Sequence, residues 1–386
     1  MLFIGIIIGL IVLVILVALH ELGHAIVARR NGVRVEEYGI GFPPAAKKWR
    51  PKQSFLGKDV TFSLNWLPLG GFVRLKGEHD AARGAGTYGA ASFWVKTKIL
   101  LAGVAVNWLT AVVLFSVLAV VGLPKLLPHQ VVLPFDNRVE RSVLTVGAIT
   151  KGSPAEHAGL QVGDQVLRVG DTEVATPSEL SAATKAQAGR SVEVVLVRGE
   201  ERLTKQVALQ SPEQAKNGGY LGVGPQQSEK IYATWSAPLL GLATTGQLTF
   251  ETIKGVGDIL AKTVTGTVGQ LFGSAEQKRA AKADIAAVGA SVAGPVGILG
   301  VLFPSVLSSG LTHLVLLAAL ISLTLAVMNI LPIPALDGGR WFTMAGFRLF
   351  RKELTKEREE TIQATGFLVL MALTVLVTWS DIAKLF

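Results

Sequence analysis

The stretch "LVALHELGHAIVARR" (residues 16–30) closes an apolar run that begins at Leu2, and it carries two histidines and a glutamate. The run from Leu2 to about Ala28 exceeds the roughly 20 apolar residues that a membrane-spanning helix needs. Ionisable side chains at membrane depth are costly, so they rarely occur there without a function. This segment is therefore predicted to be a transmembrane helix that holds part of a functional site.

His20 and His24 lie four positions apart, so a helix places both imidazoles on one face, within reach of one ion. Glu21 is displaced by one position and can face a water molecule on that ion. This pattern is typical of zinc hydrolases, with two histidine ligands and a glutamate as general base. Coincidence at a polar helix end is the alternative, and it does not explain the spacing.

A catalytic zinc usually has a third protein ligand, and the chain contains no cysteine to supply it. The segment "AVMNILPIPALDGGRWF" (326–342) places Asp337 among prolines and glycines at the end of another apolar run. Irregular backbone at membrane depth is tolerated where it is buried in protein or lines a wet cavity. Asp337 is a candidate third ligand, and an ordinary turn at a helix end is the equally weighted alternative.

The composition indicates a membrane protein with at least one water-soluble part. Half of the residues are hydrophobic and 17% are charged, and the mean hydropathy is +0.46. Four runs are apolar and long enough to span a bilayer. They extend from Leu2 to about Ala28, Ile99 to Leu123, Leu311 to Leu331 and Ile362 to Trp379.

The basic residues crowd the ends of these runs, which favours a role in membrane topology over nucleic-acid binding, despite the net charge of +9. Thirteen Lys and Arg residues lie between Ala25 and Lys98, and six lie between Arg340 and Glu360. The positive-inside rule places both segments in the cytoplasm. The metal site is then near the cytoplasmic face, and the long 124–310 segment lies on the other side.

That long segment has two parts. From about Val131 to Pro225 it contains "GSPAEHAGLQVGDQVLRVGDTEV" and other alternating patterns, which predict a soluble α/β module with two short helices. From about Glu229 onward it becomes amphipathic, with polar residues too frequent for a span. This favours a helix lying at the membrane surface.

Several motifs together resemble the site-2 protease family, peptidase family M50, and in particular the bacterial regulator-of-sigma-E intramembrane protease branch. They are "HELGH" in the first span, "LNWLPLGGFVRL" (64–75), "ASFWVKTKILLAGVAVNWLTA" (91–111), "GSPAEHAGLQVGDQVLRVGD", "AGPVGIL" (293–299) and "NILPIPALDGG" (329–339). The chain departs from this branch at Gly103-Val104, where Gly-Pro is usual, and at Arg340, where a histidine is common. It also has one PDZ domain where the best-known members have two.

The resemblance implies a multi-pass α-helical membrane protein with four transmembrane helices, a membrane-associated β-hairpin and one inserted α/β PDZ domain. The predicted segments are a first transmembrane helix with HELGH at 1–30, a cytoplasmic-side loop with the hairpin at 31–97, a second transmembrane helix at 98–123, a PDZ domain at 131–225, an amphipathic surface helix with the Gly-Pro element at 229–300, a third transmembrane helix with LDGG at 311–339, a basic cytoplasmic loop at 340–360 and a fourth transmembrane helix at 361–380.

The resemblance also implies roles for individual residues. His20, His24 and Asp337 match zinc ligands, Glu21 the catalytic base, and Asn329 a residue that steadies the substrate or the oxyanion. The candidate substrate-binding residues are Gly70, Gly71, Phe72, Val73, Asn107, Gly294 and Pro295. A strand edge in "GGFVRL" could hold an extended substrate by β-addition. The plainer alternatives are a hairpin packed under the bundle and, at the Gly-Pro element, a connector.

The implied function is a zinc metalloendopeptidase that cleaves in or near the transmembrane segment of a pre-trimmed single-pass membrane protein. The implied substrates are an anti-sigma factor or a remnant signal peptide, and the implied place is the bacterial inner (plasma) membrane. The PDZ domain would lie on the extracytoplasmic side, where it could bind an extended peptide or C-terminus and exclude full-length proteins. A metal transporter and a catalytically inactive PDZ scaffold are the alternatives; neither requires Glu21 beside His20.

Overall fold

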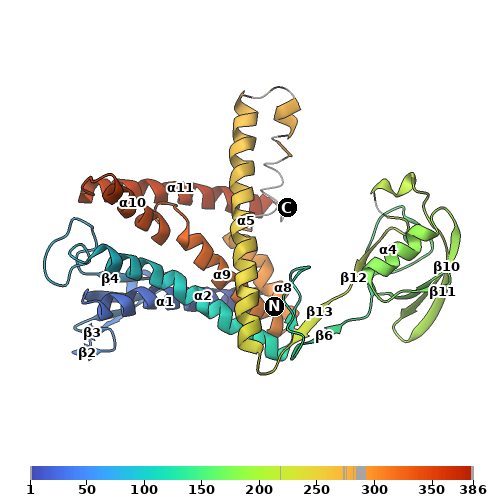
Figure 1. Ribbon diagram of the computed structural model, residues 1–386, viewed down its shortest axis with the longest axis horizontal. Helices are drawn as coiled ribbons and strands as arrows, with labels where there is room; N and C mark the ends of the chain where they lie inside the picture. The colour runs from blue at the N-terminus through green and yellow to red at the C-terminus, as the bar shows by residue number, and fades with distance from the viewer. Residues whose placement is uncertain are drawn as a thin grey trace. The chain divides into compact units, whose positions relative to one another are not determined.

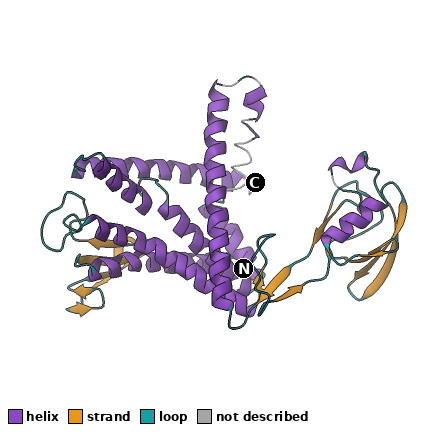
Figure 2. Cartoon of the chain, viewed as in Figure 1, coloured by secondary structure: helices purple, strands orange, loops and turns teal. Residues whose placement is uncertain are grey.

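The computed structural model describes residues 2–217, 219–272, 274, 276–280, 282–283 and 293–383. The chain forms two compact units, one made of Met1–Val121 with Trp235–Phe386 and the other of Gly122–Thr234. The first is mainly helical with a small β-layer, and the second is mainly strand (Figure 2). The candidate residues of the HELGH motif, His20, Glu21 and His24, lie in the helical unit.

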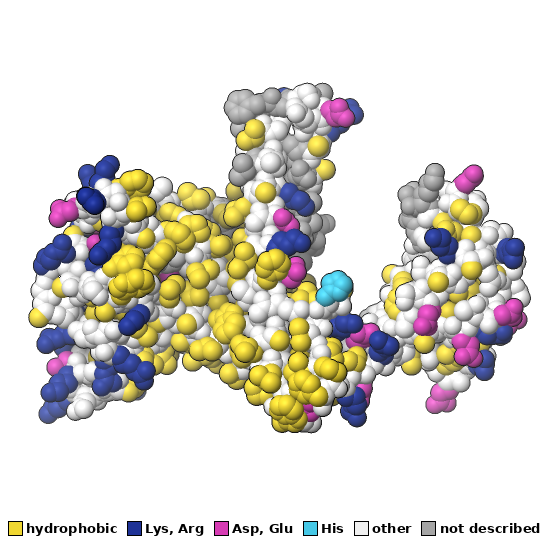
Figure 3. Space-filling view, in the orientation of Figure 1, with side chains coloured by type: hydrophobic (Ala, Val, Ile, Leu, Met, Phe, Trp, Pro, Cys, Tyr) yellow, Lys and Arg dark blue, Asp and Glu magenta, His cyan; other side chains and the backbone are white. Residues whose placement is uncertain are grey.

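Among the described residues of the helical unit, four helices are long and apolar enough to cross a membrane: α1 (Leu2–Arg30), α2 (Phe93–Val121), α9 (Leu311–Ile330) and α11 (Lys356–Ala383). The predicted four apolar spans are thus confirmed as helices. Hydrophobic side chains cover much of this unit's visible surface, whereas Lys and Arg side chains gather at the end where β1, β4 and the start of α11 lie (Figures 1 and 3).

The first span ends at a glycine. Gly32 follows α1 with φ +80°, a left-handed conformation that costs glycine little. The backbone N–H of Val33 donates to the carbonyl of Ala28 at 2.9 Å, and that of Gly32 donates to Arg29 at 3.1 Å. These bonds satisfy carbonyls that the helix end would leave unpaired.

The helix predicted over 311–339 is divided in two by the structure. Helix α9 ends at Ile330, and a new helix, α10 (Asp337–Leu349), begins seven residues later. Pro332 and Pro334 lie in the break, and proline has no N–H to continue a helix. Asp337 therefore opens a second helix, and α10 occupies part of the segment that was predicted as a basic loop at 340–360.

The segment between α1 and α2 forms a small sheet. Residues 35–40 of β1 (Val35–Trp49) pair on one side with residues 71–75 of β4 (Thr61–Leu75) and on the other with residues 61–64. Residues 45–49 of β1 then pair with residues 62–65. The segment 71–75, which includes most of "GGFVRL", is thus an edge of this sheet. The short strands β2 (Gln53–Ser54) and β3 (Gly57–Lys58) form a separate pair.

The predicted amphipathic helix corresponds to α5 (Ala237–Phe272), which runs across α2 rather than alongside it (Figure 1). Its first turns are packed, with Leu240 and Thr244 fully buried. The Trp108 indole N–H of α2 donates to the Thr249 hydroxyl at 3.0 Å. Much of the predicted segment from residue 273 to 292 lies outside the described residues.

The Gly-Pro element opens a short helical segment before α9. It consists of α7 (Pro295–Gly297), a π-helical turn over Ile298–Leu302, and α8 (Phe303–Ser308). A Cβ on Gly5 would lie 2.6 Å from Pro304 Cα, so the segment packs closely on the start of α1. It therefore contacts α1 near the end opposite the HELGH motif.

The described part of the second unit contains two sheets and two α-helices. The larger sheet has the order β11 (Glu201–Ala208), β10 (Ser191–Arg198), β8 (Gln165–Val169), β7 (Thr145–Ile149), β12 (Val223–Gln226), with β9 (Thr172–Glu173) pairing β8. The smaller sheet is β5 (Leu123–Pro124), β13 (Glu229–Tyr232), β6 (Arg138–Arg141), and the helices are α3 (Pro154–His157) and α4 (Pro177–Ala186). The α/β content matches the prediction for 131–225, in a unit whose boundaries are somewhat wider.

The core of this unit is aliphatic, and its strands alternate as the sequence predicted. Val169, Val194 and Leu196 are fully buried in it, and each such side chain contributes roughly 2 kcal/mol. Helix α4 begins with a capping box between Thr176 and Glu179, which satisfies two backbone N–H groups at the helix start.

A buried carboxylate joins the α3–β8 loop to β10. Asp164 accepts two hydrogen bonds from Arg198, at 2.7 and 2.8 Å, and one from the Gln161 N–H at 2.8 Å. Its side chain is only 1% exposed. The hydrogen bonds from Arg198 hold the pKa of Asp164 below its usual range.

We predict that Asp164→Asn destabilises the second unit by about 2 kcal/mol at pH 7, because it removes a charge-assisted pair from a buried site. Since the folded-state pKa is lowered, the wild-type advantage is complete above the unfolded pKa of about 3.9 and is lost as the pH falls below it. Hydrogen–deuterium exchange of the β8 and β10 amides in the purified full-length protein measures both effects.

The matched control is Asp171→Asn, which removes an exposed carboxylate from the same unit. It should leave the exchange of the β8 and β10 amides unchanged, at pH 7 and at a pH below the unfolded pKa of Asp164. Equal protection in wild type and Asp164→Asn at pH 7 would contradict the stabilising role of the pair.

Candidate metal centre

His20 and His24 project from α1 toward one point inside the helical unit. Both are 6% exposed, and their Nε2 atoms are 3.1 Å apart. The Nδ1 of His24 lies 2.7 Å from the carbonyl oxygen of Ile99, on α2. A proton on that Nδ1 donates to the carbonyl, which leaves the Nε2 lone pair free to bind a cation.

Asp337 reaches the two imidazoles from the start of α10. Its Oδ2 lies 3.0 Å from His20 Nε2 and 3.3 Å from His24 Nε2, although 317 positions separate it from His20. Among the described residues, the ligand atoms of these three side chains lie close enough together to hold one metal ion.

The geometry of these three atoms suits zinc. Zinc binds imidazole nitrogen and carboxylate oxygen at about 2.0–2.2 Å, so two ligand atoms at tetrahedral positions are roughly 3.3 Å apart. The observed separations of 3.0, 3.1 and 3.3 Å are close to that value. Two neutral imidazoles and one carboxylate also leave a fourth position for water or substrate, as a catalytic zinc site requires.

The Asn107 side chain of α2 contacts His20 at Nδ1, the ring nitrogen that does not face His24 and Asp337. Its side chain is 1% exposed, and its amide Nδ2 lies 3.3 Å from His20 Nδ1. Its Oδ1 is buried and has no hydrogen-bond partner among the described residues. Amide oxygen and nitrogen are assigned from such networks; with the amide turned over, Oδ1 accepts the Nδ1 proton of His20 and leaves Nε2 for a metal.

Asn107 was predicted to bind substrate. The structure places its side chain against His20, and its backbone carbonyl accepts a 2.8 Å hydrogen bond from the Ser322 hydroxyl of α9. Through its side chain and its backbone, Asn107 thus links α1, α2 and α9 at the candidate metal centre. Its sequence context showed only that it lies in a span.

Glu21 lies beside the two histidines and is bound to the sheet. Its Oε2 accepts a 3.0 Å hydrogen bond from the backbone N–H of Val73, in the edge segment 71–75 of β4. A Cβ on Gly71 would lie 3.7 Å from the Glu21 side chain. The structure therefore brings the predicted base, the predicted ligands and the predicted substrate-binding strand to one place.

The sequence comparisons agree with this geometry. The family model described as "Peptidase family M50" matches residues 8–373, which is nearly the whole chain.

The chain belongs to peptidase family M50.

Individual relatives in that family align along almost their full length. Zinc metalloprotease Rip1 of Mycobacterium tuberculosis is 30% identical over 97% of this chain and 93% of its own. Zinc metalloprotease RasP of Geobacillus kaustophilus is 25% identical over 96% of each chain. A protein of Clostridium acetobutylicum is 29% identical over 98% of each chain.

Among solved structures, the PDZ domain of the SdrC-like protein from Listeria monocytogenes aligns with 25% of this chain and 93% of its own, at 15% identity and a TM-score of 0.19. A likeness this slight carries no argument about the second unit. The predicted family, the peptidase class and the zinc cofactor are confirmed by the family match; the roles of individual residues remain predictions.

In this M50 peptidase, glycines allow the approach of Asp337. A Cβ on Gly338 would overlap the carbonyl of Ile330, and one on Gly339 would overlap the carbonyl of Ile333. Ala335 adopts φ +76°, which is strained for a residue with a side chain. Its N–H donates to Gln363 Oε1 of α11 at 2.7 Å. The backbone after α9 thus folds tightly back onto the helix end.

Arg340, one turn after Asp337, fixes α10 to its surroundings. Its Nε donates to Glu359 Oε1 of α11 at 3.1 Å, and its Nη2 donates to the backbone carbonyl of Glu78. Its guanidinium also lies 4.8 Å from the ring centre of Tyr88. In the sequence Arg340 is visible only as a departure from the usual family pattern, because these partners come from distant segments.

The remaining predicted site residues lie elsewhere or lack contacts with the centre. Asn329 is partly buried near the end of α9, and its side chain has no hydrogen-bond partner among the described residues. The Phe72 ring packs over Gly39 of β1. Gly294, which precedes Pro295, lies beside Asp381 of α11, whose Oδ2 accepts a 2.8 Å hydrogen bond from the N–H of Gly297. They are not brought to the metal centre.

Gly103 of α2 faces both histidine rings and was not predicted to have a role. A Cβ there would lie 2.6 Å from Cε1 and 2.7 Å from Nε2 of His20, and closer still to His24 Nε2. We predict that Gly103→Ala displaces the imidazoles and weakens zinc affinity by at least ten-fold, as lost ligand support typically does. Competition with a zinc chelator on the purified protein measures this affinity.

The control for this prediction is Gly246→Ala on α5, where an added Cβ meets no atom within 4 Å. That variant should bind zinc as the wild type does. If Gly103→Ala binds equally well, the rings do not occupy the positions described.

Proposed function

We propose that this M50 peptidase hydrolyses a peptide bond in or beside the transmembrane segment of a membrane protein. The observation that carries the proposal is the meeting of His20, His24 and Asp337 between candidate membrane spans, with Glu21 adjacent. Ionisable groups in such a place require a partner, and a zinc ion supplies one.

The ligands in this proposal are His20 Nε2, His24 Nε2 and Asp337 Oδ2, whose separations suit one zinc ion. Zinc in such a site supplies Lewis-acid chemistry, which polarises a carbonyl group and makes water more acidic. The Ile99 carbonyl and the Asn107 amide hold the imidazoles with their Nε2 atoms toward the ion.

Glu21 is the general base. It removes a proton from the attacking water at its carboxylate and later gives that proton to the leaving amine. Its hydrogen bond to Val73 N–H fixes one carboxylate oxygen, so the other oxygen is the one available for proton transfer. Asn329, near the end of α9, would donate to the developing oxyanion once a substrate is bound.

The substrate strand lies along the edge of β4. A helix is a poor substrate because its carbonyls are already hydrogen-bonded, so the scissile segment must be extended. Segment 71–75 pairs with β1 on one side only, and its other side faces α1 at Glu21. A peptide that adds to this edge passes directly beside the base, through Gly70, Gly71, Phe72 and Val73.

The second unit acts as a PDZ-type filter in this proposal. It lies outside the cytoplasm, recognises an extended chain or C-terminus, and excludes membrane proteins whose outer domain has not been removed. The metal centre faces the cytoplasmic side of the bacterial plasma membrane, in keeping with the Lys and Arg residues around it. The substrates are pre-trimmed single-pass proteins of the anti-sigma-factor type or remnant signal peptides.

We predict that Glu21→Gln keeps zinc but lowers cleavage of a single-span reporter by 10²–10⁴-fold, roughly the contribution of general-base catalysis. Zinc content by mass spectrometry and cleavage of a reporter in reconstituted vesicles provide the two readouts. Glu36→Gln, an exposed change on β1, is the control and should retain both.

Asp337→Ala in the same assays should lose zinc as well as cleavage, because the centre then has two protein ligands.

A metal transporter would move zinc across the vesicle membrane and leave the reporter intact. An inactive scaffold would bind the reporter without cutting it in the wild type, and either result would contradict the proposed hydrolysis.

We predict that replacing 122–234 by a short linker leaves cleavage of a pre-trimmed reporter within about two-fold of wild type. The same variant should gain the ability to cut a reporter that carries a folded outer domain, because the filter is gone. The ratio of the two cleavage rates, measured side by side in vesicles, is the readout. An unchanged ratio would remove the filter from the proposal.

A further inference from the structure

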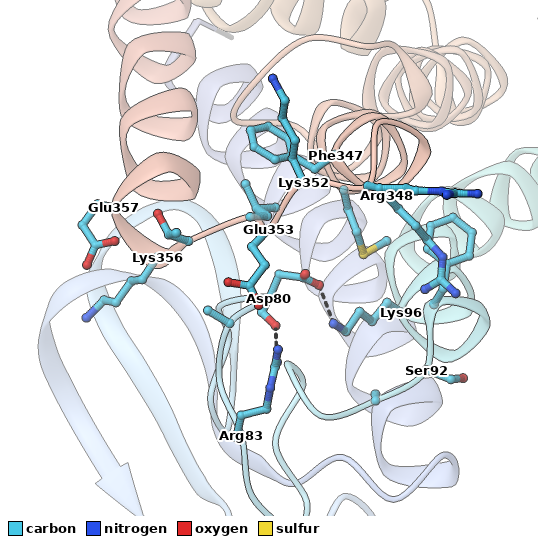
Figure 4. Close-up of a pocket in the computed structure, with 17 residues that line it drawn as sticks. Asp80, Arg83, Ser92, Lys96, Phe347, Arg348, Lys352, Glu353, Lys356 and Glu357 are labelled. Carbon is cyan, nitrogen blue, oxygen red and sulfur yellow. Dashed lines mark hydrogen bonds and ion pairs between the residues drawn. The ribbon is translucent and has the colours of Figure 1, made fainter.

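A cavity lies at the end of the helical unit, away from the metal centre. It has a volume of about 640 Å³ and is enclosed by the loop before α2, the start of α2, the end of α10 and the start of α11 (Figure 4). Since α2 and α11 are candidate membrane spans, the cavity lies at the ends of two such helices.

The lining is predominantly cationic. It contains six Lys and Arg side chains and three Asp and Glu side chains. Lys96 is paired with Asp80 at the floor, and Lys356 lies 3.8 Å from Glu360. Arg83 donates to the carbonyl of Asp80 at 3.0 Å. Half of the cationic side chains therefore already have protein partners.

The other three cations have no carboxylate partner in the part of the chain that the structure describes. They are Arg348, Arg351 and Lys352, at the junction of α10 and α11. Arg348 lies over the Phe93 ring, 5.1 Å from its centre, and in Figure 4 it and Lys352 extend away from the Asp80–Lys96 pair. Arg351 adopts φ +53°, which a residue with a side chain takes only at an energetic cost.

Large apolar side chains stand beside these cations. Leu349 is 78% exposed, Phe350 74% and Trp94, next to Phe93, 71%. Such exposure is unfavourable in water, but it is typical of segments that lie at the boundary of headgroups and acyl chains. Cations next to exposed apolar groups at this depth match the chemistry of an anionic phospholipid, whose phosphate and acyl chains are contiguous.

We propose that the α10–α11 junction binds an anionic phospholipid. The phosphate lies in the cavity against Arg348, Arg351 and Lys352, and the acyl chains lie along Leu349 and Phe350. Arginine suits phosphate because its planar guanidinium donates two parallel hydrogen bonds. The bound lipid supplies the negative charge that these three side chains lack in the protein itself.

The test is native mass spectrometry of the full-length protein in detergent, titrated with dioleoyl phosphatidylglycerol or dioleoyl phosphatidylcholine. The wild type should retain phosphatidylglycerol at least ten-fold more tightly. Arg348→Gln/Arg351→Gln/Lys352→Gln should remove this preference, since each cation near a phosphate strengthens binding several-fold. Equal binding of the two lipids by the wild type would overturn the proposal.

A charge-matched variant separates this site from general attraction. Lys47→Gln/Lys52→Gln/Lys58→Gln removes three exposed cations from the β1–β4 region of the same unit, and it should change phosphatidylglycerol affinity by less than two-fold. An equal loss in both triple variants would show non-specific attraction and refute the site. Unchanged gel filtration and thermal unfolding show that each variant is folded.

Two further arms distinguish a lipid from free phosphate. Leu349→Ser/Phe350→Ser should weaken phosphatidylglycerol binding by at least five-fold while all three cations remain. Inorganic phosphate at millimolar concentration should not displace the lipid. Displacement by phosphate, together with full affinity in Leu349→Ser/Phe350→Ser, would identify a free-anion site and overturn the lipid assignment.

Discussion

The contact of Asp337 with His20 and His24 is the constraint on which the helical unit depends. It joins residues 317 positions apart and requires that α1 and α10 approach within hydrogen-bond distance. A half-buried carboxylate and two buried imidazoles are tolerable only together or with a cation, because each alone would lose hydration without compensation. The surrounding packing serves this meeting: Gly103 gives the rings space, and Gly338 and Gly339 let α10 start against the end of α9.

The sequence revealed those parts of the site that lie within one turn of helix. His20, Glu21 and His24 could be assigned roles because helical spacing fixes their directions. Asp337 was less certain from the residues alone, since "LDGG" also fits a turn, and the resemblance to M50 peptidases was needed to favour it. Glycines are poor helix formers, so the start of α10 was not expected; here the close approach to the carbonyls of Ile330 and Ile333 outweighs propensity.

Features that depend on distant partners could not be predicted. Asn107 was identified as a site residue, but its contact with His20 is visible only once α1 and α2 are packed. Arg340 looked like a departure from the family pattern, and its function as a link between α10, α11 and the loop at Glu78 comes from three separate segments. The sheet was expected as a local hairpin at 64–75. In the structure, residues 35–40 lie between two segments of β4, a pairing that local turn signals do not specify.

Helix α11 is held by hydrogen bonds near its two ends, and Gln363 and Gly366 in its first half contact the segment before α10. Near its start, Glu359 accepts bonds from Arg340 and from the N–H of Asp80, and near its end Asp381 accepts one from Gly297. Between them Phe367, Leu368, Val369 and Leu376 are exposed. The exposed turns between these ends therefore need only be apolar and long enough. Substitutions among aliphatic residues there should accumulate freely during evolution, whereas the carboxylates of Glu359 and Asp381 should be retained.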